Sequence, residues 1–340
     1  MVDPPPPLVE KDGIPKVYSA LGAFFHLEHI EPDDEARLDR VNDLVHDWFG
    51  ERLTFMEAPF VGGIPPFRRA DLDYISGYCR TLELPADPEQ RPAAITFDLG
   101  RDGYSLRCCG GAERSHASPY GYGFWSTFGG GGAEARIPAC SVLRLTVPDT
   151  WPHEDFAARV TAIARELRLR WAAAGLTYAT WEVYGHQVED EAIYAHARRY
   201  LGYDVPHYLN STVQLFDAIR SVNWLTFVGP ALAGRLREAG QKLESSGPLQ
   251  VSSAGSSALI RAGDRPEPGD VNRLQIPRAY QAADALVRPV RASGTPAQSL
   301  LLFGSPWSVA ETSEWLQRFG KGGVLPPPPP PASPDDDIPF

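Results

Sequence analysis

Strand-like and helix-like segments alternate irregularly along this 340-residue sequence, and this order limits the possible folds more than any other feature. A doubly wound fold needs regular units in which helices connect parallel strands. Here several short strand-like runs follow one another with only glycine-rich turns between them. The pattern therefore favours an α+β fold, in which mixed, mostly antiparallel sheets pack with helices. The expected strands lie at residues 17–30, 93–99, 104–109, 123–128, 141–147, 177–184, 222–228, 249–251 and 257–260.

Helices are predicted where apolar residues recur every three or four positions. The first should open at Pro32-Asp33-Asp34, because proline and acidic residues suit a first helical turn, and it should close at Gly50. The longest predicted helix covers residues 152–174 and should end at Gly175. Further helices are expected at residues 70–82, 189–201, 276–290 and 311–319, with a short one beginning at Pro230.

Proline-rich segments occupy both ends of the sequence. Residues 3–15 contain five prolines, and residues 326–331 are six consecutive prolines. Such segments favour an extended, solvated chain. We therefore expect disordered tails at residues 1–15 and 321–340 and one α+β domain at residues 16–320. The C-terminal tail could alternatively be a ligand for an aromatic-lined groove, which would make the protein a scaffold.

Composition and charge narrow the classes of function. A formal net charge of −11 argues against direct binding to nucleic acid, which needs a basic surface, and suits a basic partner instead. No apolar run reaches the 18 residues of a membrane span, and the first residues lack the pattern of a signal peptide. The four cysteines form no C-x-x-C pair, so we expect reduced thiols in a cytoplasmic protein.

Motifs of catalysis and metal binding are missing from the sequence. The four glycines at residues 129–132 precede an acidic residue instead of the Lys-Ser/Thr of a phosphate loop. There is no G-x-S-x-G elbow and no H-E-x-x-H. His26 and His29 lie three apart on an expected strand, so their side chains should point to opposite faces. We therefore predict no catalytic residues, no metal site and no cofactor.

An acidic stripe is predicted on the first helix. Carboxylates recur at a strict spacing of four, and residues four apart share one face of a helix. The stripe could be a solvated face, partly relieved by Arg37 and Arg40, or a surface matched to a basic partner. Its residues are Glu35, Asp39, Asp43, Asp47 and Glu51.

A second acidic feature is the segment RAGDRPEPGDVNR at residues 261–273. Its carboxylates, Asp264, Glu267 and Asp270, could form a metal or acid/base site, although their spacing fits no calcium loop. The segment could also be a partner-binding surface. A third possibility is a polar turn, in which Gly269 supplies the turn and Asp270 caps a helix.

The second half of the sequence resembles a known family. In order it contains SVNWLTFVG (221–229), SSALIRAGDRPEPGDVNR (256–273), IPRAYQAADALVRPVR (276–291) and EWLQRF (314–319). These strings resemble the type VI immunity family, the cognate inhibitors of VRR-NUC nuclease toxins delivered by type VI secretion. The resemblance runs from about Tyr18 to Phe319 and is most specific from Val222 to Arg291. The proline-rich tails and the glycine-rich segment from Cys109 to Ala135 depart from the family's pattern.

The resemblance implies a cytoplasmic immunity protein without catalytic activity. Such a protein binds its cognate toxin and occludes the toxin's active or DNA-binding surface. For the partner-binding residues, the two acidic features are the candidates: Glu35, Asp39, Asp43, Asp47, Asp264, Glu267 and Asp270. The alternative function is an enzyme with an unrecognised acidic site around Asp264, Glu267 and Asp270.

Overall fold

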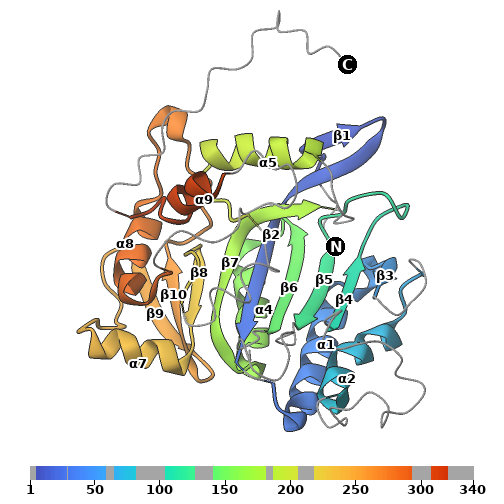
Figure 1. Ribbon diagram of the computed structural model, residues 1–340, viewed down its shortest axis with the longest axis horizontal. Helices are drawn as coiled ribbons and strands as arrows, with labels where there is room; N and C mark the ends of the chain where they lie inside the picture. The colour runs from blue at the N-terminus through green and yellow to red at the C-terminus, as the bar shows by residue number, and fades with distance from the viewer. Residues whose placement is uncertain are drawn as a thin grey trace, which may run out of the picture.

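A computed structural model describes residues 5–28, 30–58, 65–81, 104–126, 141–180, 187–205, 218–292 and 308–320. In this part of the chain ten strands form one sheet, in the order β3-β4-β5-β6-β2-β7-β8-β10-β9, with β1 paired to β2 outside this path (Figure 1). All neighbouring strands run antiparallel, which confirms the predicted α+β fold class. The strands are β1 (Val9–Lys11), β2 (Ile14–Leu27), β3 (Phe55–Glu57), β4 (Tyr104–Cys109), β5 (Gly121–Ser126), β6 (Ser141–Pro148), β7 (Leu169–Thr180), β8 (Leu225–Val228), β9 (Leu249–Ala254) and β10 (Ser257–Ala262).

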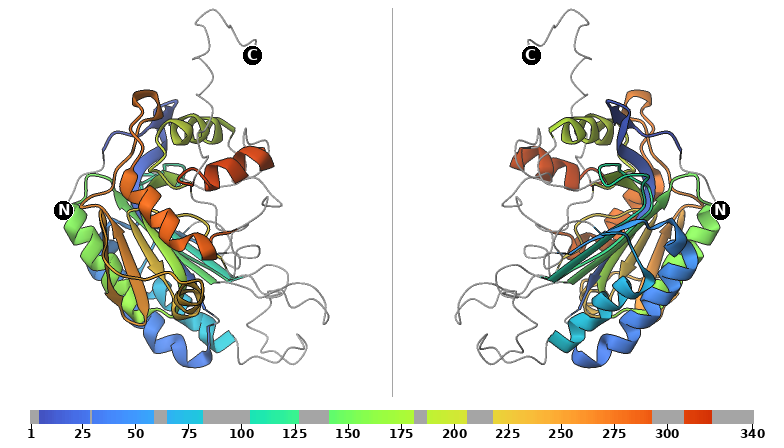
Figure 2. Two further views of the ribbon diagram at one scale, coloured as in Figure 1. Left: turned by 90° about the vertical axis from the view of Figure 1, so that its left-hand side faces the viewer. Right: turned by 90° about the vertical axis from the view of Figure 1, so that its right-hand side faces the viewer.

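Seven α-helices lie in the described residues, and α1 and α4 cover one side of the sheet while α9 lies on the other (Figure 2). Short 3-10 helices precede or extend several of them. The α-helices are α1 (Glu35–Phe49), α2 (Asp73–Thr81), α4 (His153–Glu166), α5 (Gln187–Arg199), α7 (Pro230–Glu238), α8 (Arg278–Val287) and α9 (Val309–Leu316). The 3-10 helices are η1 (Pro32–Asp34), η2 (Gly50–Arg52), η3 (Arg69–Leu72), η5 (Val271–Arg273) and η6 (Arg288–Val290).

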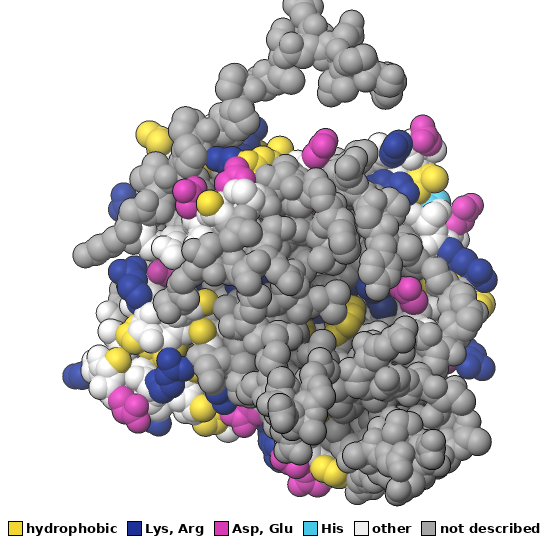
Figure 3. Space-filling model, in the orientation of Figure 1, with side chains coloured by type: hydrophobic (Ala, Val, Ile, Leu, Met, Phe, Trp, Pro, Cys, Tyr) yellow, Lys and Arg dark blue, Asp and Glu magenta, His cyan; other side chains and the backbone are white. Residues whose placement is uncertain are grey.

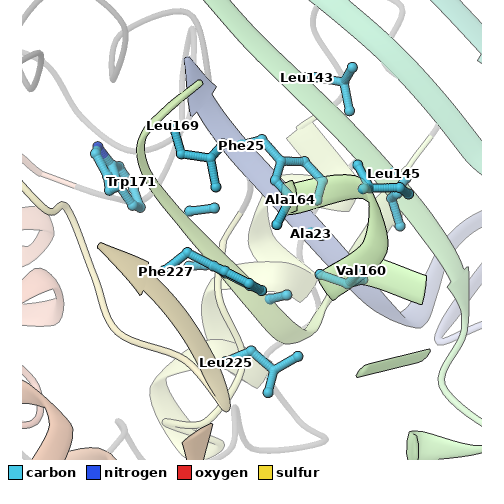
Figure 4. Close-up of a cluster of buried hydrophobic side chains, with 14 of the residues drawn as sticks. Ala23, Phe25, Leu143, Leu145, Val160, Ala164, Leu169, Trp171, Leu225 and Phe227 are labelled. Atoms are coloured by element: carbon cyan, nitrogen blue, oxygen red, sulfur yellow. The ribbon is translucent and has the colours of Figure 1, made fainter. Parts of the chain in front are cut away.

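The central strand β2 shows why the sheet can bury both faces. Successive side chains of a strand point to opposite faces. Leu21 and Phe25 belong to the main hydrophobic core, whereas Tyr18 and Phe24 belong to two smaller buried clusters. Figure 4 shows side chains of β2, β6 and β8 gathered around Val160 and Ala164 of α4. The helix α4 therefore holds the centre of the sheet from one side.

The segment after α4 corrects one prediction. A helix was expected over residues 152–174, but α4 ends at Glu166 and β7 begins at Leu169. Leu167 and Trp171 continue the helical spacing, yet β7 lies between β2 and β8, where apolar side chains are buried on both faces. Pairing across the sheet outweighs the helix propensity of the three alanines at 172–174. Gly175 lies inside this strand, where a Cβ atom would meet Asn223 Oδ1 at 2.2 Å.

The N-terminal segment gives a second correction. Residues 1–15 were expected to be disordered, but Val9–Lys11 form β1, which pairs with β2 from Ile14 onward. Asp12 and Gly13, both at positive φ, make the tight turn of this hairpin. A paired strand therefore lies within the segment that was expected to be disordered, and Pro15 itself is part of β2. The predicted tail at residues 321–340, the predicted strand at 93–99 and the glycine run at 129–132 lie outside the described residues.

A buried ionic network joins the C-terminal helices to the sheet. Arg220 donates to Asp204 at 2.7 Å, and both side chains are almost fully buried. Arg291 pairs with Asp284 of α8 at 2.9 Å and donates to the carbonyl of Leu316 at the end of α9. Arg318, also buried, donates to the carbonyl of Leu201 at 2.7 Å. Segments that are up to 117 residues apart in the sequence are thus held together by arginine side chains.

Candidate functional site

The predicted acidic stripe lies on the outer side of α1. Leu38, Val41, Val45 and Trp48 are buried and fix the orientation of the helix. Asp43 and Asp47 are exposed as a result, whereas Glu35 and Asp39 are half-buried, and their charges act on Cys79 of α2. Glu51 follows in η2 and is exposed. The spacing of four therefore predicted the stripe correctly, although its first half is the less accessible part.

The cations near the stripe differ from those expected. Arg37 pairs with Asp34 at 3.6 Å, and Arg40 donates to Glu166 of α4 at 2.7 Å. Neither bond relieves the stripe directly. Instead, Arg69 of η3 bonds to Asp43, whose side chain stays 63% exposed, and also donates to Asp73 at 2.8 Å. The carboxylate of Asp43 is thus paired with an arginine of η3, the 3-10 helix that precedes α2.

The loop between β10 and η5 is held at both ends. Arg261, at the end of β10, pairs with Glu154 of α4 at 2.9 Å and donates to the carbonyl of Asp264. In the middle of the loop, the carbonyl of Pro268 accepts a hydrogen bond at 2.7 Å from the amide of Gly202, which follows α5. A Cβ atom on Gly202 would lie 1.8 Å from the carbonyl oxygen of Glu267, so only glycine permits this contact.

Asp270 is a structural residue of this loop. Its carboxylate accepts from the Asn272 amide at 3.0 Å and caps η5. The same carboxylate accepts two bonds from Arg199 of α5, at 3.0 and 3.3 Å, and lies 3.6 Å from Arg273. These bonds lower the pKa of Asp270, the bond from Arg199 most strongly. Gly269 precedes it at φ +62°, so the predicted combination of glycine turn and aspartate cap is confirmed.

Asp264 and Glu267 are exposed, in contrast to Asp270, which is 6% exposed. The cations Arg265 and Arg273 beside them are exposed as well. Among the described residues no group of three or more His, Cys, Asp or Glu side chains gathers to hold a metal ion. The loop therefore offers two free carboxylates in a mixed-charge surface, and its third carboxylate serves the fold.

The two acidic features lie on different elements, and the start of α4 lies between them: Trp48 of α1 packs on Phe156 of α4, and Arg261 beside the loop pairs with Glu154 of α4. Figure 1 shows α1 at the lower right and α5 at the top, and Arg199 of α5 holds the loop through Asp270. Around the edge of the face drawn in Figure 3, acidic and basic side chains are interspersed. The stripe and the loop share no residue and no secondary-structure element, so they are two candidate surfaces.

His26, Cys79 and Cys109 are placed for packing. His26 stacks on Trp171 at 3.9 Å between ring centroids, and burial together with Arg220 lowers the pKa of His26 well below its usual value. Burial raises the pKa of the Cys79 and Cys109 thiols to about 12. A thiol with so high a pKa is a poor nucleophile at neutral pH. His29, His186, His207 and Cys140 lie outside the described residues.

Two features were not predicted from the sequence. Leu274, next to the capped turn, is 88% exposed. The arginine network around Asp204 and Asp284 was missed because its members are spread over more than a hundred residues, with no local pattern. For Leu274 the neighbouring residues gave no signal, since a single leucine between Arg273 and Gln275 is equally consistent with a buried position.

The sequence pattern of the TsiV family, described as type VI immunity for VRR-NUC, matches residues 91–319. The match ends where the predicted resemblance ends, at Phe319, but begins later than the predicted Tyr18. It includes the loop from Gly263 to Asp270 and does not include α1. No curated protein matches the sequence.

Among solved structures, the chain is similar to the Pseudomonas aeruginosa T6SS protein PA0821. The TM-score is 0.70 at 19% sequence identity, and the alignment covers 92% of this chain and 85% of that one. At this level of identity the similarity concerns the fold. Within the described part of the chain, no helix has both the length and the apolar character needed to cross a membrane.

Proposed function

Because the chain belongs to the TsiV family of type VI immunity proteins for VRR-NUC toxins, we propose that it neutralises its cognate toxin by covering the surface that binds or cleaves DNA. The family match over residues 91–319, which extends from before β4 to beyond α9, is the observation that carries this proposal. The family consists of inhibitors, so the protein is not an enzyme. Its partner is the cognate VRR-NUC toxin.

Electrostatics supports occlusion of a DNA-binding surface. A nuclease must present a basic surface to the phosphate backbone. The immunity protein has a formal net charge of −11, so long-range attraction would bring it toward that surface. A bound acidic protein would then exclude DNA both by its volume and by its charge. The toxin's target is nucleic acid, so we also propose that neutralisation takes place in the cytoplasm.

Exposed carboxylates on either acidic feature could contact the toxin. On α1 these are the exposed stripe residues Asp43 and Asp47, with the half-buried Glu35 and Asp39 beside them. On the loop they are Asp264 and Glu267. Asp270 contributes indirectly in this proposal, because its carboxylate is occupied by Arg199 and the Asn272 amide.

Co-expression tests the proposal. The VRR-NUC domain of the neighbouring toxin gene is expressed in a susceptible host with this chain, with an unrelated immunity protein, or with an empty vector. We expect survival and intact chromosomal DNA only with this chain. A catalytically inactive toxin domain controls for toxicity that does not depend on DNA cleavage. Equal killing in all three hosts would reject the proposed function, provided that the host given this chain contains it in soluble form.

A further inference from the structure

Leu274 is the most exposed large hydrophobic residue in the described part of the chain. Its exposed fraction is 88%, compared with 42% for Leu8 and 36% for Leu44. Its neighbours Val271 and Ile276 are partly buried and pack against the core, whereas Leu274 extends outward from them. A single exposed leucine is ordinary on a protein surface. The backbone conformation at this position, however, is unusual for a leucine.

Leu274 adopts a left-handed conformation, with φ +56° and ψ +27°. Branched, bulky residues rarely occupy this region because the Cβ atom approaches the backbone, and glycine or asparagine is usual there. A glycine would satisfy the turn at lower cost. The leucine therefore costs conformational energy relative to glycine, and it leaves an apolar side chain 88% exposed to water. Strain of this kind tends to persist at functional positions.

The backbone under Leu274 is rigid. Asp270 and Gln275 exchange two backbone hydrogen bonds, at 2.7 and 2.9 Å, and close the turn. The Leu274 amide donates to the carbonyl of Val271 at 3.0 Å. The Asp270 carboxylate, held by Arg199 of α5, fixes the same turn to the body of the protein. The backbone that carries the leucine is thus fixed, and little backbone entropy would be lost when a partner covers the side chain.

We propose that Leu274 is the apolar anchor of the toxin interface and inserts into an apolar pocket on the VRR-NUC domain. This inference rests on the proposed function and selects the loop, rather than α1, as the centre of contact. Interfaces of this kind place an apolar side chain at the centre and charged groups at the rim. Arg273, Asp264 and Glu267 are exposed around the loop and would supply that rim.

Charge favours the toxin over a second copy of this chain as the occupant. Two copies with a net charge of −11 repel each other, whereas a DNA-binding domain is attracted. The loop also lies inside the segment that matches the immunity family, whereas α1 lies before it. The alternative occupant is a second copy of this chain, and sedimentation would detect it as a dimer that depends on Leu274.

The test separates binding from folding through three substitutions at this position. Leu274→Gly removes the anchor and relieves the left-handed strain, so the melting temperature should stay the same or rise. Binding to the inactive VRR-NUC domain should nevertheless weaken by about 30-fold or more, the size expected for an anchor at the centre of an interface. Leu274→Ala should weaken binding to a similar extent. Leu274→Met keeps an apolar side chain and should retain most of the affinity, and Leu8→Ala is the exposed-leucine control.

The outcomes distinguish the anchor from the function on which it rests. If the wild-type chain itself fails to bind the VRR-NUC domain, the proposed function is wrong. If the wild-type chain binds and Leu274→Gly binds equally well, only the anchor is wrong. A wild-type dimer in sedimentation that Leu274→Gly dissociates, with toxin binding unchanged, would assign the residue to self-association and would also overturn this inference.

Discussion

His196 of α5 is packed among tyrosines and makes the stability of the fold depend on pH. Its Nδ1 atom is 2.8 Å from the Tyr178 hydroxyl, and its ring lies 4.9 Å from that of Tyr203. Burial, together with the nearby charge of Arg199, lowers the pKa of His196 to about 4. The folded protein therefore keeps this imidazole neutral at a pH where the unfolded chain, with a histidine pKa of about 6.5, takes up a proton.

The predicted consequence is a loss of stability as the pH falls below about 6.5. Between pH 7.5 and 5 the unfolded state binds more protons at this site, so His196 should account for about 1–2 kcal/mol of the lost unfolding free energy. His196→Asn keeps an acceptor near Nδ1 and removes the titration. Urea unfolding at the two pH values should show a smaller loss in this variant than in the wild-type protein. Parallel losses would mean that the imidazole is not held neutral.

At the scale of elements, the stripe on α1 is accessible enough to act at long range. Charges at the edge of an interface change the association rate and its salt dependence more than the dissociation rate. Replacing Glu35, Asp39, Asp43 and Asp47 by Gln or Asn should slow association with the toxin by about tenfold at low salt, and the deficit should shrink as salt screens the charges. Folding should survive, because the Asp43–Arg69 pair is exposed and removing like charges relieves repulsion.

A second variant neutralises the other acidic feature for comparison. Asp264→Asn with Glu267→Gln neutralises the loop and leaves Asp270 to cap η5. Association kinetics of both variants, measured at low and at high salt, show which acidic feature faces the toxin during encounter. If neither variant changes the association rate at any salt concentration, acidic steering is wrong, and an apolar contact is left to explain binding.

Several elements were predictable because their signals are local. Pro32-Asp33-Asp34 and Gly50 delimit the region of α1, and Pro230 begins α7. Gly255 makes the turn of the hairpin between β9 and β10. The strand β7 was not predictable from periodicity, because consecutive buried residues satisfy both a helical and a doubly buried strand pattern. Only its position between β2 and β8 decides in favour of the strand.

At the scale of the whole molecule, the Arg220–Asp204 pair should be important for stability. Its Nη2–Oδ2 distance is 2.7 Å, and the two side chains are 4% and 2% exposed. Asp204→Ala would leave the guanidinium buried without its carboxylate and should destabilise the fold by about 3–5 kcal/mol. Arg40→Ala breaks a pair of equal length that is largely exposed, so it should cost at most about 1 kcal/mol. Similar losses for the two variants in chemical denaturation would show that the buried pair has no special role.

The candidate surface could be predicted only in part. The spacing of four placed the α1 stripe, and the glycine beside Asp270 indicated a capped turn. The sequence could not show that Arg199, 71 residues before Asp270, occupies that carboxylate. Nor could it show that the turn places Leu274 in water, because exposure depends on how α5, η5 and α8 come together in space.

Inhibition of DNA cleavage by the purified protein tests the central claim most directly. The chain is titrated into the VRR-NUC domain at several DNA concentrations. Occlusion predicts that cleavage falls in proportion to the bound chain and stops at equimolar amounts. It also predicts that more DNA raises the concentration of chain needed, since both compete for one surface. Undiminished cleavage by a toxin saturated with this chain would contradict the account, as would complete inhibition at far less than equimolar chain, which would indicate a catalytic mechanism.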